Sequence, residues 1–159
     1  MTTIVLIGDS GVGKSNILGQ YLRHGYVQDF NPTIGVNFAV KTVQVGSQAT
    51  KVHIWDTAGR EQYRMPTNYY HGAVGVMLVY DITNHTSYES MARWLHEIRR
   101  HADAGIIMTL VGNKMDLANR RTVPAEVAKS FNDLFYIETS ALNGTNVEIA
   151  FRSTLVKGG

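Results

Sequence analysis

Residues 8–15 read Gly-Asp-Ser-Gly-Val-Gly-Lys-Ser, a glycine and four residues followed by Gly-Lys-Ser. An apolar, β-branched run at 2–7 precedes this segment and a helical pattern follows it. In such a strand-to-helix turn, glycines let backbone N–H groups approach an anion, and the helix N-terminus adds partial positive charge. Lys14 would then contact the β- and γ-phosphates of a nucleotide, and the Ser15 hydroxyl would bind Mg²⁺. The alternative is an ordinary glycine-rich turn.

A second group of chemically active residues follows another strand-like run. Asp56 begins the segment Asp-Thr-Ala-Gly at 56–59. A carboxylate at a strand end can hold a water bound to Mg²⁺, and the Gly59 N–H can approach a γ-phosphate because no side chain intervenes. The alternative for Asp56 is a buried carboxylate that caps a turn.

Two further segments suggest recognition of a base. Asp116, in Asn-Lys-Met-Asp at 113–116, can accept hydrogen bonds from N1–H and the 2-amino group of guanine, whereas adenine has neither donor. Lys114 would lie along the base plane, and Asn113 would connect this segment to the phosphate loop. In the segment 138–142, Ser140 would support the loop while the Ala141 N–H donates to guanine O6. Together, the segments predict a guanine nucleotide site.

Alternating strands and helices must position these residues. A mostly parallel sheet covered by helices on both faces is expected, and its loops meet at the carboxyl ends of the strands. A hairpin turn at 45–48 makes the second and third strands an antiparallel pair. Strands are expected near 2–7, 35–45, 49–56, 74–80, 106–112 and 135–138, and helices near 14–23, 86–101, 124–132 and 146–156.

Composition narrows the class of protein. The chain has 159 residues, which suits one domain, and 44% hydrophobic with 18% charged residues is typical of a globular protein. A net charge of +2 argues against nucleic acid as a partner. We see no membrane-spanning run and no secretory signal. There is no cysteine, hence no disulfide and no thiol for a lipid anchor, and the six histidines show no metal-ligand spacing.

At this point the chain resembles the Ras-like small GTPases, and within them the Rab group. The resemblance runs from Ile4 to Leu155. The Rab-type segments are Ile-Gly-Val-Asn-Phe at 34–38, Ile-Trp-Asp-Thr-Ala-Gly at 54–59, Tyr-Tyr-His-Gly-Ala at 69–73 and Leu-Val-Tyr-Asp-Ile-Thr at 78–83. The segments 101–103 and 145–148 are similar to the recycling-endosome branch of the Rabs.

The resemblance implies an α/β fold of the P-loop NTPase type, with a six-stranded, mostly parallel sheet containing one antiparallel strand. It implies one GTPase domain over 1–159 whose C-terminal tail is cut off, with GTP or GDP and Mg²⁺ as ligands. The residues that the resemblance implies as nucleotide contacts are Ser10, Gly11, Val12, Gly13, Lys14, Ser15, Asn16, Tyr26, Thr33, Gly59, Asn113, Lys114, Asp116, Ser140, Ala141 and Leu142. The implied metal ligands are Ser15, Thr33 and Asp56. The implied catalytic residues are Lys14, Thr33, Gly59 and Arg60.

Several implied roles have simple alternatives. Thr33 resembles the switch threonine that binds Mg²⁺ and senses the γ-phosphate, but it can also be a solvent-facing loop residue. Tyr26 would cover the guanine face or anchor a helix end. Phe38, Trp55 and Tyr69 resemble the Rab aromatic triad that contacts effectors, although strand aromatics often belong to the core.

The resemblance also implies partners and a location. Effectors, an exchange factor and an activating protein would bind the switch segments. Rabs attach to endosomal or Golgi membranes through a prenylated C-terminal tail, which this chain lacks, and otherwise stay in the cytoplasm.

The chain departs from the Rab pattern at Arg60. The family has a glutamine there, which orients the attacking water and both donates and accepts hydrogen bonds, whereas arginine only donates. Gln62 is two residues away, too far to substitute without a shifted loop. We therefore expect slow intrinsic hydrolysis. The chain is also one residue short between Tyr63 and Tyr69, and about three short between Phe131 and Glu138.

Three functions fit these observations. The first is a GTP-dependent switch in membrane traffic with slow hydrolysis. The second is a GTP-binding scaffold with little or no turnover, suggested by Arg60. The third is a metabolic phosphotransferase, which the absence of a lid-sized insertion disfavours.

Overall fold

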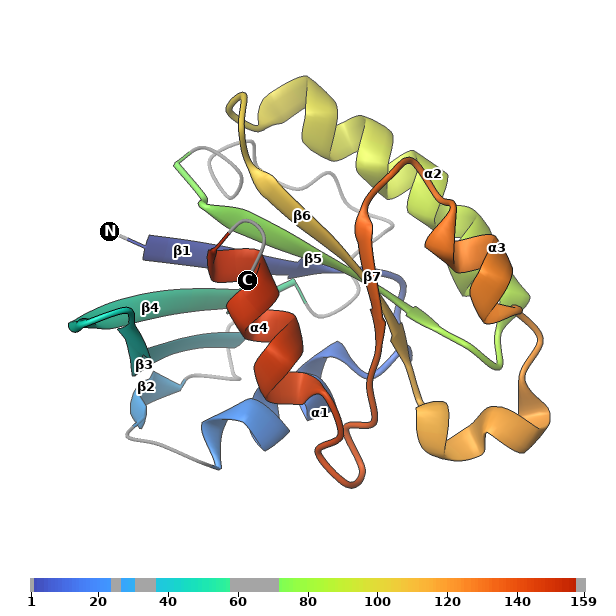
Figure 1. The fold of residues 1–159 in the computed structure, drawn as a ribbon, viewed down its shortest axis with the longest axis horizontal. Helices are drawn as coiled ribbons and strands as arrows, with labels where there is room; N and C mark the ends of the chain where they lie inside the picture. Colours follow the sequence, from blue (N-terminus) through green and yellow to red (C-terminus); the bar gives the residue numbers. More distant parts are fainter. Residues whose placement is uncertain (1, 24–26, 31–36, 58–71, 157–159) are drawn as a thin grey trace.

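The computed structural model describes residues 2–23, 27–30, 37–57 and 72–156. These residues form a twisted sheet between two layers of helices (Figure 1). The strands are β1 (Thr2–Ile7), β2 (Val27–Phe30), β3 (Asn37–Val45), β4 (Gln48–Asp56), β5 (Gly75–Asp81), β6 (Ile107–Asn113) and β7 (Phe135–Glu138). The helices are α1 (Lys14–Leu22), α2 (His85–His101), the 3₁₀ helix η3 (Met115–Arg120), α3 (Ala125–Lys129) and α4 (Val147–Leu155).

The sheet has the order β2-β3-β4-β1-β5-β6-β7. Among the described strands, β3 alone runs opposite to the rest, because it pairs antiparallel with both β2 and β4 while the other pairs are parallel. The expected hairpin joins β3 to β4, with Val45 opposite Gln48, and extends beyond the helical layers (Figure 1). The predicted fold class is confirmed.

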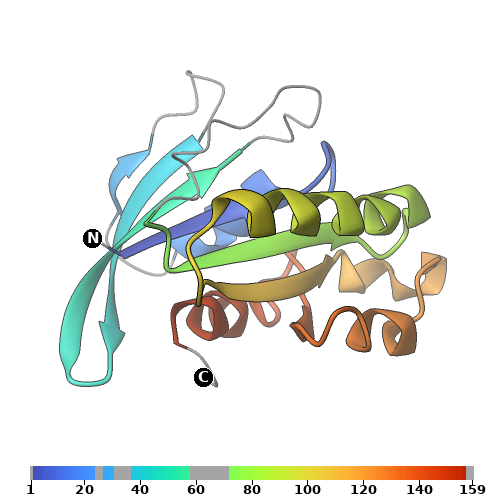
Figure 2. The same cartoon turned by 90° about the horizontal axis from the view of Figure 1, so that it is seen from above.

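The central strands are buried on both faces because helices cover each side. Val5 and Ile7 of β1 face a cluster that contains Trp94 of α2, whereas Ile4 and Leu6 face a cluster that contains helices α1 and α4. Figure 2 shows α2 and α4 on opposite sides of the sheet. This explains why β1 and β5 are continuous apolar runs rather than alternating ones.

The predicted elements agree with the observed ones to within two residues, with three exceptions. The short strand β2 was not expected, so the sheet has one strand more than the six predicted. Helix η3 was not expected either. The third predicted helix, 124–132, is wrong at its end, because Asn132 and Asp133 have positive φ angles of 50° and 58°. A right-handed helix cannot include residues in this conformation.

Helix α2 illustrates how local sequence fixes an element. The Asn84 side chain accepts a hydrogen bond from the Ser87 N–H and caps the helix start. Arg99, Arg100 and His101 lie in the last turn, where positive charge interacts favourably with the helix dipole. Of the helices in the described ranges, none has the length and apolar character needed to span a bilayer.

Packing of α4 provides a first prediction. Phe151 is fully buried and stacks on Tyr21 of α1, with ring centroids 3.8 Å apart. Phe151→Ala should lower the free energy of unfolding by about 3–5 kcal/mol, because it leaves a cavity between α1, α4 and the sheet. Ile149→Ala, on the same helix but 46% exposed, is the control and should stay within about 0.5 kcal/mol. Equal losses in urea unfolding would contradict this packing.

Candidate functional site

Four loops meet at one edge of the sheet. Strands β1, β4, β6 and β7 point in the same direction, so the loops after their carboxyl ends lie on one side. This edge is where ligands bind in open α/β sheets. The residues involved follow Ile7, Asp56, Asn113 and Glu138.

The loop at residues 8–15 wraps around the Lys14 side chain. Gly13 has φ 99°, and a Cβ there would lie 2.3 Å from the Asn113 side-chain nitrogen, so only glycine fits. The Lys14 ammonium donates hydrogen bonds to the carbonyl oxygens of Gly8 and Asp9, at 2.8 and 2.9 Å. A lysine held across a concave loop at the start of α1 is suited to bind phosphate.

Asp9 anchors the same loop to α2. Its carboxylate accepts hydrogen bonds from the Ser90 hydroxyl at 2.5 Å and the Trp94 indole N–H at 3.0 Å. The Arg93 guanidinium lies 3.6 Å from it. These contacts fix the start of the phosphate loop from the side, and our sequence interpretation missed them because α2 is about 80 residues away along the chain.

Ser15 and Asp56 provide two oxygens for a cation. The Ser15 hydroxyl donates to the Asp56 carboxylate at 2.6 Å, and Asp56 is fully buried. Hydroxyl and carboxylate oxygens suit Mg²⁺, which usually keeps water and phosphate oxygens as its remaining ligands. No cluster of three or more His, Cys, Asp or Glu side chains is found in the ranges that the structure describes.

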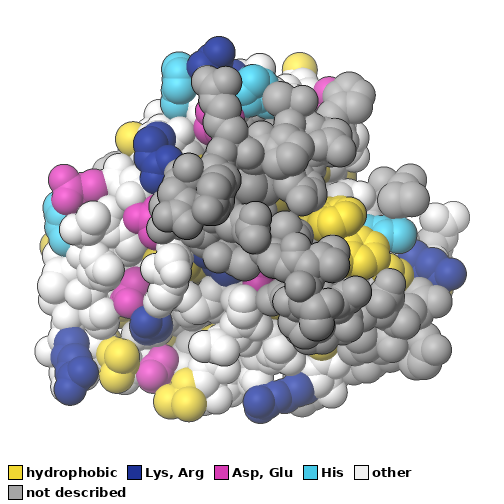
Figure 3. Space-filling view, turned by 180° about the vertical axis from the view of Figure 1, so that it is seen from behind, with side chains coloured by type: hydrophobic (Ala, Val, Ile, Leu, Met, Phe, Trp, Pro, Cys, Tyr) yellow, Lys and Arg dark blue, Asp and Glu magenta, His cyan; other side chains and the backbone are white. Residues whose placement is uncertain are grey.

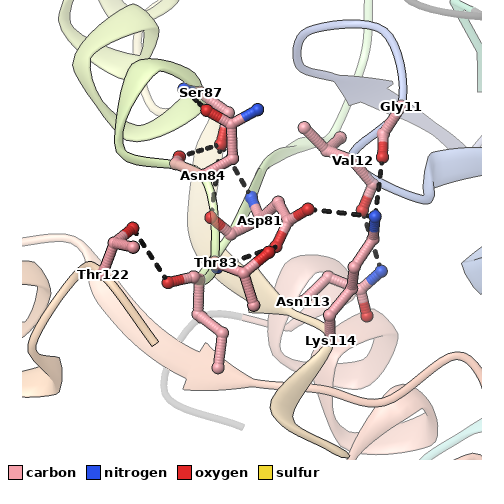
Figure 4. Close-up of polar contacts among 10 residues, drawn as sticks. Gly11, Val12, Asp81, Thr83, Asn84, Ser87, Asn113, Lys114 and Thr122 are labelled. Atoms are coloured by element: carbon pink, nitrogen blue, oxygen red, sulfur yellow. Dashed lines mark hydrogen bonds and ion pairs between the residues drawn. The ribbon is translucent and has the colours of Figure 1, made fainter. Parts of the chain in front are cut away.

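Asn113 joins three of the loops. Its Nδ2 donates to the Val12 carbonyl at 2.9 Å, and its Oδ1 accepts from the Thr139 hydroxyl at 2.9 Å. Asn113 is 1% exposed, so these bonds are shielded from water. The predicted connection between Asn113 and the phosphate loop is therefore present in the structure (Figure 4).

Lys114 lies between the base segment and the phosphate loop. Its ammonium donates to the Gly11 carbonyl at 3.0 Å and pairs with the Asp81 carboxylate at 2.9 Å (Figure 4). Lys114 itself has a positive φ of 70°, which ends β6 and turns the chain into η3. The sequence interpretation did not assign a role to Asp81, although it ends a fully buried strand at the same edge.

The Asp81 carboxylate has several donors around it. Besides Lys114, the Thr83 N–H and hydroxyl donate to it at 2.8 and 2.7 Å. Burial acts to raise the pKa of Asp81, but the hydrogen bonds from Thr83 and Lys114 outweigh it and keep the pKa below its ordinary value. Asp81 is therefore charged at neutral pH and holds Lys114 in place.

A cleft that could hold a base lies between Asp116 and the loop after β7; we call it the base cleft. Ser140 is buried and donates to the exposed Asp116 carboxylate at 2.8 Å, while the Asn143 N–H donates to Ser140 at 3.3 Å. The other Asp116 oxygen accepts no hydrogen bond from the described residues. The cleft has a volume of about 560 Å³ and is lined by Gly13, Ser15, Asn16, Gly19, Gln20, Arg23, Asn113, Lys114, Asp116, Leu117, Ala141 and Leu142.

A guanine nucleotide with Mg²⁺ fits the residues present. A smaller cleft of about 270 Å³, lined by Ser10, Gly11, Gly13, Lys14, Ser15, Asn16 and Lys114, shares four residues with the base cleft. Lys14 lines the smaller cleft, Asp116 lines the larger one, and Lys114 lines both. The buried Oε1 of Gln20, which lines the base cleft, has no hydrogen-bond partner among the described residues.

Several predicted residues cannot be placed. Tyr26, Thr33, Gly59, Arg60 and Tyr69 lie outside the described residues. The predicted contacts of these residues with base, metal, phosphate or effector therefore stay predictions.

Two of the three aromatics assigned to effectors are described. Phe38 and Trp55 are partly exposed neighbours on β3 and β4, with ring centroids 4.5 Å apart. His53 lies 5.7 Å from the Phe38 ring. The view from behind shows hydrophobic side chains gathered beside a histidine at one place on that face (Figure 3).

Comparison with known proteins identifies the family. The model described as the Ras family matches residues 3–157. The match spans every loop described above.

The Asp81–Lys114 pair gives a second prediction. Asp81→Asn should weaken nucleotide affinity about tenfold and lower the free energy of unfolding by about 1–3 kcal/mol at pH 7, because Lys114 loses a charged partner. Titration with a fluorescent guanine nucleotide and urea unfolding measure the two effects. Asp133→Asn is the control, because Asp133 is exposed and asparagine tolerates its positive φ.

The pH dependence of this effect follows from the pKa of Asp81. Because folding lowers this pKa, the carboxylate stabilises the protein above its unfolded-state pKa and loses the effect as pH falls through the folded-state pKa. The stability difference between wild type and Asp81→Asn should therefore shrink on acidification. A difference that stays constant down to acid unfolding would contradict the ion pair.

Proposed function

Since the chain belongs to the Ras family, whose members are GTP-binding switches with GTPase activity, we propose that it is a guanine-nucleotide switch of the Rab type in membrane traffic. It cycles between GDP and GTP forms, and the GTP form recruits effectors. One GTPase domain spans residues 1–159.

The observation that carries the nucleotide part is the arrangement around Asp116. Ser140 fixes one carboxylate oxygen, and the group lines a cleft beside Asn113 and Lys114. A carboxylate in this position accepts from both guanine donors, and it would face the bare N1 of adenine. Such a site can reject the wrong base by about four to five orders of magnitude.

The phosphate end of the cleft is served by the loop at residues 8–15. Lys14 and the backbone N–H groups would hold the phosphates, and Ser15 with Asp56 would hold Mg²⁺ together with Thr33. Bound there, Mg²⁺ would neutralise part of the negative charge of the phosphates. The Asn113 hydrogen bond to the Val12 carbonyl holds the phosphate loop in position relative to the base cleft.

The switch depends on contacts that the γ-phosphate makes and GDP lacks. Thr33 and Gly59 are the residues we assign to this contact. To move the protein from mostly one form to mostly the other, these contacts must favour the GTP form by about 5.5 kcal/mol. Loss of the γ-phosphate releases both segments.

Partners and location follow the Rab pattern. Effectors bind the switch segments together with Phe38, Trp55 and Tyr69. The partly exposed, neighbouring rings of Phe38 and Trp55 support this assignment. An exchange factor and an activating protein act on the same segments. A prenylated tail beyond these residues would bring the protein to endosomal or Golgi membranes.

Nucleotide binding predicts a large thermal shift. Adding GDP and Mg²⁺ at about 1,000 times the dissociation constant should add roughly 4 kcal/mol to the folding stability. Differential scanning fluorimetry of nucleotide-stripped protein measures the shift. ADP at the same concentration is the control and should leave the melting temperature unchanged; the same shift with ADP would contradict guanine selection.

Arg60 predicts a slow hydrolysis step. Arg60→Gln should raise the single-turnover rate of GTP hydrolysis by at least about tenfold, because glutamine accepts a hydrogen bond from the attacking water and arginine does not. Arg120→Gln, at an exposed position after the base loop, controls for the loss of charge. Equal rates for wild type and Arg60→Gln would refute the assignment. A wild-type rate near zero would favour the alternative, a GTP-binding scaffold.

A further inference from the structure

Four polar side chains of β5, β7 and the segment after η3 form a continuous hydrogen-bonded chain. The Tyr80 and Tyr136 hydroxyls lie 2.8 Å apart, and the Tyr136 hydroxyl also donates to the Glu138 carboxylate. Arg121 donates to both oxygens of Glu138, at 2.7 and 2.6 Å. We call these four residues the base-loop brace.

The brace connects the two segments that line the base cleft. Arg121 immediately follows η3, the helix that contains Asp116. Glu138 ends β7 and is followed by Thr139 and Ser140, which bond to Asn113 and Asp116. Two side-chain contacts therefore join the segment 116–121 to the segment 138–140. Ser140 bonds to Asp116 at one end, and Arg121 pairs with Glu138 at the other.

The brace also reaches the strand that carries Asn113. A Cβ on Gly112 would lie 2.7 Å from the Tyr136 hydroxyl oxygen and 2.9 Å from that of Tyr80. The two hydroxyls thus pack directly on the backbone of the residue before Asn113, which only glycine allows. Movement of either tyrosine would displace the start of the base segment.

Charge states in the brace are well defined. Burial raises the pKa of Tyr80 and, together with the Glu138 carboxylate, that of Tyr136, so both hydroxyls stay neutral. Burial acts to raise the pKa of Glu138, but hydrogen bonds from Arg121 and Tyr136 outweigh it and lower the pKa. Glu138 is therefore an anion that receives three hydrogen bonds from neighbouring side chains.

Tyr80 is fully buried, whereas the Arg121 and Glu138 side chains are 25% and 15% exposed. A hydrogen-bonded network that is mostly shielded from water contributes more to a defined geometry than to net stability, since apolar side chains of similar volume are often as stable. From this we propose that Tyr80, Arg121, Tyr136 and Glu138 are positioning residues that set the geometry of the base cleft, and thereby the release rate of guanine nucleotide and the strictness of base selection. This inference depends on the proposed function. None of the four residues need touch the nucleotide.

The test uses the release rate of fluorescently labelled GDP and the affinity ratio of GDP to IDP, which lacks the 2-amino group. Tyr136→Phe keeps the ring and removes the central hydroxyl. We expect it to raise the release rate about tenfold and to lower the GDP-to-IDP ratio, because one shared hydrogen-bonding group positions both segments. Arg121→Lys, which cannot form the bidentate pair, should act in the same direction but more weakly.

The double variant Tyr80→Phe/Tyr136→Phe separates positioning from stability. It removes both partners of the Tyr80–Tyr136 bond, and both Glu138 oxygens keep their hydrogen bonds from Arg121. The free energy of unfolding should therefore stay near the wild-type value while release remains fast. The matched controls are Tyr88→Phe, whose ring packs on Tyr80 but whose hydroxyl lies outside the brace, and Arg120→Lys. Both should release GDP at the wild-type rate.

Two results would overturn the inference, and they differ from failure of the proposed function. Brace variants that unfold more easily but keep the wild-type release rate and GDP-to-IDP ratio would show a purely structural role. Faster release in the controls as well would show a non-specific effect. If wild-type protein bound no GDP at all, the proposed function itself would fail.

Discussion

The site depends on one buried amide, the side chain of Asn113. This side chain bonds both to the phosphate loop, at the Val12 carbonyl, and to the loop after β7, at Thr139. An amide side chain has a donor NH₂ group and an acceptor oxygen. It can therefore bond to a carbonyl in one loop and to a hydroxyl in the other without carrying a net charge. Its burial keeps water from competing for either bond.

The consequence is that the two ends of the cleft cannot move independently. Gly13 must lack a side chain to make room for Asn113, so the phosphate loop takes its shape partly from the base segment. Lys114 adds a second connection through Gly11 and Asp81. A base bound at Asp116 and a phosphate bound near Lys14 would therefore contact two connected loops, so base identity could influence phosphate affinity.

Much of this arrangement was predictable from the sequence. The spacing of Gly8, Lys14 and Ser15 and the segment Asn113–Asp116 fixed which residues line the cleft, because each follows a strand of a parallel sheet. The strand β2 was missed because its four residues show no apolar alternation. The end of α3 was missed because the left-handed conformation of Asn132 and Asp133 is not encoded by hydrophobic periodicity.

Contacts between distant residues were not predictable. Asp81 lies 33 residues from Lys114 along the chain, and Tyr80 lies 56 residues from Tyr136. Only the register of β5, β6 and β7 brings the members of each pair together. A tyrosine in an apolar strand is usually read as core, and its hydroxyl partner depends on which strand packs next to it. For Arg60, in contrast, the sequence alone was informative, because an arginine at the position of the expected glutamine predicts a change in hydrolysis.

The most direct test of the central claim is competition between bases. Nucleotide-free protein is loaded with an equimolar mixture of GTP and ATP in the presence of Mg²⁺, freed of unbound nucleotide, denatured, and the retained nucleotide is identified by chromatography. We predict guanine nucleotide only. Retention of adenine nucleotide, or of neither, would contradict the account.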